Sequence, residues 1–175
     1  HPDSISIGLN NAISADSLKS YLLKLRSFIN RNSGSDTLSS VKGIGTTRRW
    51  IYAKFEQFGS VNQNRLVTSY LQFNRSICGA SQHRNVFAVL PGTDTSDKSI
   101  VIIEGHMDSR CGTSCDTACV AEGMEDNGSG TALVLELART MSKYAYKNTI
   151  IFMTTTAEEQ GLYGAEAFAE YAKSK

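Results

Sequence analysis

Two apolar segments with an amphipathic helix between them constrain the fold of this chain more than any other feature. The segments are SIVIIEG (residues 99–105) and NTIIFMTTT (residues 148–156), and both have the composition of buried strands. The helical pattern between them begins near Ser129 and continues as GTALVLELARTM. Strand, helix and strand in this order predict a βαβ unit, which crosses over right-handed and places the two strands parallel.

A helical lead-in is predicted over residues 14–59. Its first helix follows the candidate caps Ser14 and Asp16, and the segment RNSGSD (residues 31–36) ends it. Its apolar residues recur at helical spacing on one face: Leu18, Tyr21, Leu22, Leu25, Phe28 and Ile29. A second helix, with an aromatic stripe, is expected to stop at Gly59.

Strands and a last helix complete the predicted domain. RLVTSYLQF (residues 65–73) and RNVFAVLPG (residues 84–92) indicate an antiparallel strand pair, and a helix is expected from about Leu162. With 41% hydrophobic residues, the chain can form one compact domain over residues 1–175. We expect an α/β fold with three layers, α/β/α, around a mixed, largely parallel sheet that is incomplete in this chain. Its strands and polar motifs occupy residues 65–175.

The charge balance excludes several classes of function. Lysine and arginine number 18 and the acids 17, which gives a net charge of +1 without any basic run. This balance argues against a nucleic-acid surface and against an anionic membrane as partner. No apolar segment approaches the roughly 20 residues of a membrane helix. The start His1-Pro2, without methionine or a signal-peptide pattern, indicates a start produced by processing or cloning.

Four cysteines indicate an exported protein, secreted or periplasmic. Cys111, Cys115 and Cys119 lie close together and Cys78 lies apart, so that the even count permits two disulfides. A small metal site and free thiols are the alternatives, but the spacing lacks the paired C-x-x-C units of a metal site. The sequence leaves the connectivity of the four cysteines open.

Polar residues follow both predicted parallel strands and precede the helix between them. His106 and Asp108 come after the first strand, Asp126 leads into the helix, and Glu158 and Glu159 come after the second strand. Because parallel strands end together, these residues are expected at one edge of the sheet. One imidazole and several carboxylates there are the ligand types of a zinc or dinuclear metal site. Separately, each motif could be structural: a hydrogen-bonded histidine, a turn, and a solvated acidic pair.

The positions of these residues suggest individual roles. Asp108 is close enough in sequence to hold the second ring nitrogen of His106, which a metal-binding imidazole requires. Asp126 precedes a helix N-terminus, which favours its ionised form. Glu158 and Glu159 diverge as neighbours, so that one can bind metal while the other serves as a general base.

Three segments, EGHMDS, EDNGSG and AEEQGLYGA, resemble in order and spacing the motifs of peptidase family M28, which contains zinc aminopeptidases and carboxypeptidases. The resemblance covers about residues 84–172. It implies that His106 binds one zinc ion, Asp126 bridges two, and Glu159 binds the other. It also implies that Glu158 is the general base and that Asp108 orients His106. The implied function is a zinc-dependent exopeptidase, most simply an aminopeptidase, that removes N-terminal residues from peptide substrates.

The resemblance is incomplete in one respect. The family completes its site with a further aspartate and a further histidine after the segment that matches EEQG, and this chain has neither there. We therefore expect the chain to be the N-terminal part of a catalytic domain whose remainder is needed to complete the metal site. Two rival functions stay open: a zinc acyltransferase that resembles glutaminyl cyclases, and a non-catalytic interaction domain that keeps the peptidase fold.

Overall fold

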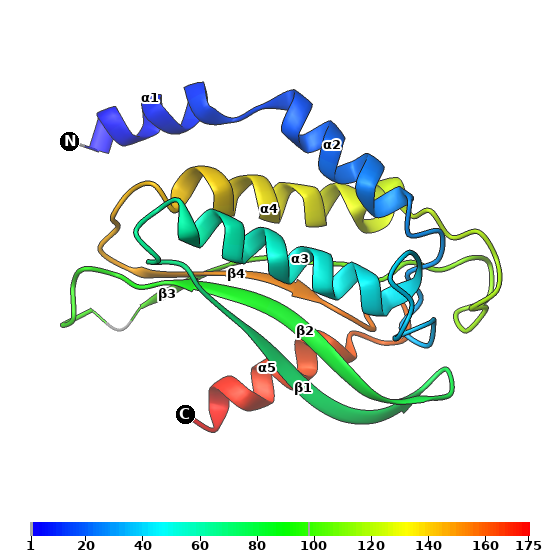
Figure 1. Cartoon of the computed structure of the whole chain (residues 1–175). Helices are drawn as coiled ribbons and strands as arrows, with labels where there is room; N and C mark the ends of the chain where they lie inside the picture. The colour runs from blue at the N-terminus through cyan, green and yellow to red at the C-terminus, as the bar shows by residue number, and fades with distance from the viewer. Residues whose placement is uncertain (1, 98) are drawn as a thin grey trace.

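The computed structural model describes residues 2–97 and 99–175 (Figure 1). Its regular elements in chain order are α1 (Pro2–Ala12), α2 (Ala15–Arg26), α3 (Gly43–Ser60), β1 (Val67–Ile77), β2 (Ala80–Leu90), β3 (Ile100–His106), α4 (Gly130–Met141), β4 (Thr149–Thr155) and α5 (Tyr163–Lys173). An irregular helical turn, Met124–Ser129, leads into α4. The predicted strands and helices from residue 65 onwards are all present, with ends that shift by a few residues.

One sheet organises the described residues, with the strand order β1-β2-β4-β3. β3 and β4 are parallel and are connected through α4, as the βαβ pattern predicts. β1 pairs antiparallel with β2, and β2 pairs antiparallel with β4. The mixed α/β sheet is therefore confirmed, but the expectation of a largely parallel sheet is wrong for the described residues. The reason is that the predicted hairpin, which turns at Cys78 and Gly79, joins the sheet through β2, and β2 lies antiparallel beside β4.

Helices cover both faces of this sheet (Figure 1). α3 and α4 lie on one face, with α1 and α2 outside them, and α5 lies on the opposite face. The main core lies under α3 and α4 and contains the fully buried side chains of Ile51, Phe55, Val86, Leu135 and Phe152. The expected three-layer arrangement is thus confirmed. None of the described helices combines the length and the apolar character needed to cross a membrane.

The start of α2 shows how local sequence signals connect to tertiary packing. Ser14 caps the helix, and its hydroxyl accepts the N–H of Ser17 at 3.1 Å. The N–H of Ser14 itself donates to the buried carboxylate of Glu136 in α4 at 2.7 Å, which ties the two helices together. Helix α1, which the sequence did not predict, comes before this cap and also packs on α4.

Both disulfides join parts of the chain near the carboxyl ends of β3 and β4. Cys78 in the β1–β2 turn pairs with Cys115, and Cys111 pairs with Cys119. The expectation of two disulfides is met, and both bonds together use all four cysteines of the sequence. The loop that follows β3 is therefore closed on itself and anchored to the hairpin.

β3 lies at the edge of the sheet, because it pairs only with β4 among the described residues. Ile100, Val101 and Ile102 are each about half-exposed there. Beside them, on the α5 side, lies an apolar cavity of about 350 Å³, with a lining of Phe87, Val89, Ile100, Ile102, Ile151, Phe168, Tyr171, Ala172 and Lys175. Within the described residues, this edge of the sheet is uncovered.

Candidate functional site

The carboxyl ends of β3 and β4 bring two of the three polar motifs together. His106 is the last residue of β3 and lies opposite Thr155 of β4 in the parallel register. The N–H of Met107 donates to the carbonyl of Thr155 at 2.8 Å, so that the pairing continues past the end of the strand. Glu158 follows β4 directly and therefore reaches the same edge of the sheet as His106.

The third motif reaches this edge because α4 begins directly behind β3. A Cβ atom at Gly105 would lie 2.9 Å from the backbone carbon of Gly130, so that glycine is required for this approach. The hydroxyl of Thr131 donates to the carbonyl of His106 at 2.9 Å. The turn before α4 thereby carries Asp126 to His106, which explains why an apolar strand ends in glycine and histidine.

The imidazole of His106 is held from both sides. Its Nδ1 lies 3.2 Å from the backbone carbonyl of Asp108, to which it can only donate, and 3.5 Å from the Oδ1 of Asp108. Its Nε2 lies 3.0 Å from the Oδ1 of Asp126 and 3.7 Å from the Oε2 of Glu158. The structure therefore brings four of the five predicted site residues into one cluster. Asp108 contacts Nδ1, so that Nε2 is the ring nitrogen that faces Asp126 and Glu158.

Electrostatics in this cluster favour the charged imidazole. Burial alone would lower the pKa of His106, but the hydrogen bond and charge of Asp108, together with the charges of Glu158 and Asp126, raise it to about 9. A proton is thus held on His106 in the metal-free protein at neutral pH. A cation that binds Nε2 would have to displace that proton.

Asp108 supports the cluster in a second way that its sequence position did not reveal. The carboxylate is fully buried, and its two oxygens accept the backbone N–H groups of Glu158 and Glu159 at 3.3 and 3.2 Å. One side chain therefore contacts His106 after β3 and fixes the chain after β4. The predicted proximity of Asp108 to the ring of His106 is met, with the backbone carbonyl making the shorter contact.

Glu159 is the predicted site residue that the structure places apart from His106. Its Oε2 accepts the Nε–H of Arg110 at 2.7 Å. Burial raises the pKa of Glu159 above its ordinary value, as do the charges of Asp126 and Asp108, while Arg110 opposes this shift. Arg110 was not predicted as a site residue, although its position two residues after Asp108 was the available signal.

The donor types of the cluster suit zinc, but the set is partial. Imidazole nitrogen and carboxylate oxygen are common zinc ligands, and the Nε2 of His106 faces two carboxylates. The exposed side chain of Asp126, 74% accessible, can reach a cation outside the present contacts. Within residues 2–97 and 99–175, no group of three or more histidine, cysteine or acidic side chains is arranged as a metal site. The residues therefore fit zinc in kind and fall short of a full set of ligands.

In the metal-free protein, the raised pKa of His106 predicts a loss of stability at alkaline pH. The ordinary value is 6.5 and the folded value about 9, so that the stabilisation is fully present below pH 6.5 and is lost as the pH rises through about 9. We expect the destabilisation caused by His106→Gln to be larger at pH 6 than at pH 10, by on the order of 1–3 kcal/mol. Urea unfolding of both proteins in a chelating buffer measures it, and an equal difference at the two pH values would contradict it.

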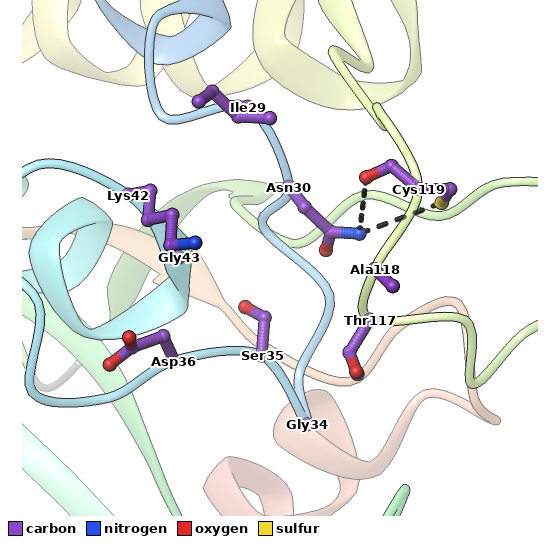
Figure 2. A pocket seen from close by; sticks show the side chains of 10 residues that line it. All are labelled: Ile29, Asn30, Gly34, Ser35, Asp36, Lys42, Gly43, Thr117, Ala118 and Cys119. Carbon is purple, nitrogen blue, oxygen red and sulfur yellow. Dashed lines mark hydrogen bonds between the residues drawn. The ribbon is translucent and has the colours of Figure 1, made fainter.

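Two open cavities lie near the loop that follows β3. One, of about 440 Å³, borders the cluster and has a lining of Arg110, Cys111, Gly112, Gly123, Met124, Glu125, Asp126 and Glu159. Figure 2 shows the other, also about 440 Å³, between the segment after α2 and the disulfide-bonded loop. It includes Lys42 and Asp36 but none of the predicted site residues. The first cavity, whose lining includes Asp126 and Glu159, can therefore admit a ligand beside the cluster.

Sequence comparison with known proteins finds matches among metallopeptidases. A family model described as "Peptidase family M28" matches residues 85–175. A curated protein of Pyrenophora teres f. teres named "Probable zinc metalloprotease" is 34% identical over 179 residues. That alignment covers 99% of this chain and 38% of the relative. The chain thus spans well under half the length of this relative.

Solved structures with a similar fold include an aminopeptidase and a glutaminyl cyclase. The Legionella pneumophila LapA aminopeptidase matches with a TM-score of 0.76 and 26% identity, over 99% of this chain and 43% of that one. A glutaminyl cyclase from Tannerella forsythia matches with a TM-score of 0.60 and 17% identity, over 83% of this chain and 47% of that one. The second likeness concerns the fold alone.

Proposed function

Because the chain belongs to peptidase family M28, we propose that it forms part of a zinc-dependent exopeptidase that hydrolyses N-terminal residues from peptides. The observation that carries this proposal is the convergence of His106, Asp126 and Glu158 at the carboxyl edge of the sheet. A histidine with one ring nitrogen held and the other facing carboxylates is arranged as metal-binding histidines are. The likeness to an aminopeptidase supports the same reaction class.

Residues 1–175 are proposed to be the N-terminal portion of the catalytic domain, with the helical lead-in and the motif-bearing part in one unit. The uncovered edge of β3 and the apolar cavity beside it support this proposal, because such surfaces are usually covered in soluble proteins. The partial ligand set supports it as well. The remainder of the domain would then complete both the sheet and the metal site.

His106, Asp126 and Glu159 are the proposed zinc ligands, in a site for two ions. Asp126 has two carboxylate oxygens and can bridge, whereas His106 and Glu159 would each serve one ion. Glu159 must exchange its contact with Arg110 for the metal, and its side chain is little exposed where it now lies. Asp108 is proposed to orient His106 through Nδ1 and to hold the backbone of Glu159.

Glu158 is the proposed general base. When bound, zinc supplies Lewis-acid polarisation of the scissile carbonyl and lowers the pKa of water to about 7. Glu158 takes the proton from the attacking water on its carboxylate and passes it to the leaving amine. Its backbone N–H is fixed by Asp108, while its side chain is 37% exposed and free to meet water and substrate.

We place the protein outside the cytosol, in a secreted or periplasmic setting. Two disulfides in a chain of 175 residues support this proposal, because disulfides persist in oxidising compartments. Both lie beside the candidate site, so that a reducing compartment would loosen the loop that borders it.

The proposed reaction predicts a specific substrate pattern for the complete protein. We expect hydrolysis of an unblocked tripeptide, no hydrolysis of its N-acetylated form, and loss of activity with a chelator that zinc restores. A peptide with N-terminal glutamine tests the rival reaction, because an aminopeptidase releases free glutamine from it. Mass spectrometry distinguishes that product from a pyroglutamyl peptide. Cyclisation without release would overturn the proposal in favour of an acyltransferase, and absence of any reaction would favour an interaction domain.

A further inference from the structure

Arg31 is a fully buried arginine that no role proposed above uses. Its guanidinium donates to four backbone carbonyls: the Nε–H to Met107 at 2.9 Å, Nη1 to Leu25 at 3.2 Å and to Glu122, and Nη2 to Gly123 at 2.9 Å. No carboxylate of the described residues lies within ion-pair distance of it. Arg31 thus serves as a donor to backbone from separate parts of the chain.

The carbonyls that Arg31 holds flank the proposed metal ligands. Met107 directly follows His106, and Gly123 lies three residues before Asp126. Gly123 has a positive φ of 46°, and its carbonyl also accepts the N–H of Gly128 at 2.9 Å, which closes the turn that carries Asp126. One guanidinium therefore connects the backbone after β3 to the backbone before α4.

The charge of Arg31 adds to this connection. Burial lowers the pKa of Arg31 to about 10, against the opposing effect of Asp108, so that the side chain stays positive at neutral pH. Asp108 is the buried carboxylate that contacts His106. Arg31 therefore places a fixed positive charge in the same interior as that buried carboxylate.

Neighbours of Arg31 in the sequence bond to the same surroundings. The side-chain amide of Asn30 donates to the carbonyl of Cys119 at 2.9 Å (Figure 2). The hydroxyl of Ser33 accepts the N–H of Ala157 at 2.9 Å. Ala157 has a left-handed φ of 58° and directly precedes the two glutamates, so that this bond holds a strained backbone position. The segment after α2 therefore contacts all three motif-bearing parts of the chain.

We propose that Arg31 is a positioning residue of the metal site, which sets the separation of His106 and Asp126 through the backbone on either side of them. This inference rests on the proposed function, because it takes these two residues as zinc ligands. For packing alone, an apolar side chain of similar volume would avoid the desolvation of a buried charge. An apolar side chain could not, however, hold carbonyls of separate segments at fixed distances.

The experiment compares Arg31→Met and Arg31→Lys with wild type in the complete protein. Zinc affinity is measured by competition with a chromophoric chelator, and the cobalt-substituted proteins give absorption spectra that report ligand geometry. We expect Arg31→Met to weaken zinc binding by about 10–100-fold, which is the usual effect of mutating a residue that orients a metal ligand. We also expect it to change the cobalt spectrum. Arg31→Lys keeps the charge but not the planar set of donors, so that its effect is expected to be intermediate.

Amide hydrogen exchange provides a readout that does not depend on zinc. In Arg31→Met, the N–H groups of Met107, Ala121 and Gly128 are expected to exchange at least about tenfold faster through local opening. Phe55→Leu is the matched control. Phe55 is as fully buried as Arg31, but it belongs to the main hydrophobic core and has no proposed role in the metal site. It is expected to lower global stability while zinc affinity and the cobalt spectrum stay at wild-type values.

Each outcome decides the inference. Unchanged exchange, zinc affinity and cobalt spectrum in Arg31→Met would overturn it, and so would an equal loss of zinc affinity in Phe55→Leu. If Arg31→Met does not fold, the same criteria apply to Arg31→Lys. If wild type binds no zinc but exchange accelerates selectively in the variant, the proposed function fails, whereas the positioning of the two backbone segments by Arg31 is supported.

Discussion

Glu158→Gln is expected to lower kcat of the complete protein by roughly 10²–10⁴-fold, the usual contribution of a general base, while the zinc content stays at the wild-type level. The amide has the size of the carboxylate but cannot accept a proton. In our proposal Glu158 is not a zinc ligand, so that the metal should remain. Initial rates on an unblocked tripeptide and elemental analysis of the same sample measure both quantities.

Glu166→Gln is the matched control for this substitution. Glu166 lies in α5 and pairs with Arg75 on the surface, where both side chains are about half-exposed. Loss of such a pair costs at most about 1 kcal/mol of stability and touches no proposed catalytic group. We expect its kcat within about twofold of wild type. An unchanged rate in Glu158→Gln would contradict the proposed mechanism, and a loss of zinc would reassign Glu158 as a ligand.

The fold was predictable where periodicity and turn chemistry act locally. The βαβ unit follows from two apolar segments and one amphipathic helix, and the structure shows β3 and β4 parallel. The relative directions of all four strands were not predictable in this way, because the antiparallel pairing of β2 with β4 joins segments that are far apart in the sequence. The same holds for the disulfides, since the pairing of Cys78 with Cys115 needs the hairpin turn and the loop after β3 to meet in space.

The location of the candidate site in the fold was predictable from the sequence, but the contacts between its side chains were not. Because parallel strands end at the same edge of a sheet, the sequence predicts that His106, Asp126 and Glu158 lie close together, and the structure shows them in contact. Side-chain direction within the site depends on competing partners that sequence does not rank. Glu159 turns to Arg110 in the structure, because a nearby guanidinium satisfies a little-exposed carboxylate.

Arg31 marks the limit of reasoning from residue patterns. Charged residues after a helix are usually exposed, and RNSGSD has the composition of a loop, so the segment was interpreted only as the end of a helix. The structure instead buries this arginine completely. Its burial is stable because backbone carbonyls from elsewhere in the chain surround it, and no local pattern reports where those carbonyls lie.

Asp126→Ala is expected to remove zinc from the complete protein. Asp126 is the proposed shared ligand of both ions, so that its loss takes a ligand from each, and we expect the zinc retained after exhaustive dialysis to fall at least about tenfold. With zinc removed from both proteins, the raised pKa of His106 should also be lower in the variant than in wild type, because one of the negative charges that raise it is gone. Elemental analysis and NMR titration of the imidazole measure these two effects.

Two comparisons make this prediction specific. Asp16→Ala removes an acidic residue from the first turn of α2, outside the site, and should leave the zinc content unchanged. The 175-residue chain alone presents only a partial ligand set, so that it should lose zinc on dialysis even with Asp126 present. Stoichiometric zinc in Asp126→Ala would mean that the ion sits elsewhere, and tight zinc in the chain alone would mean that the partial site needs no further ligands.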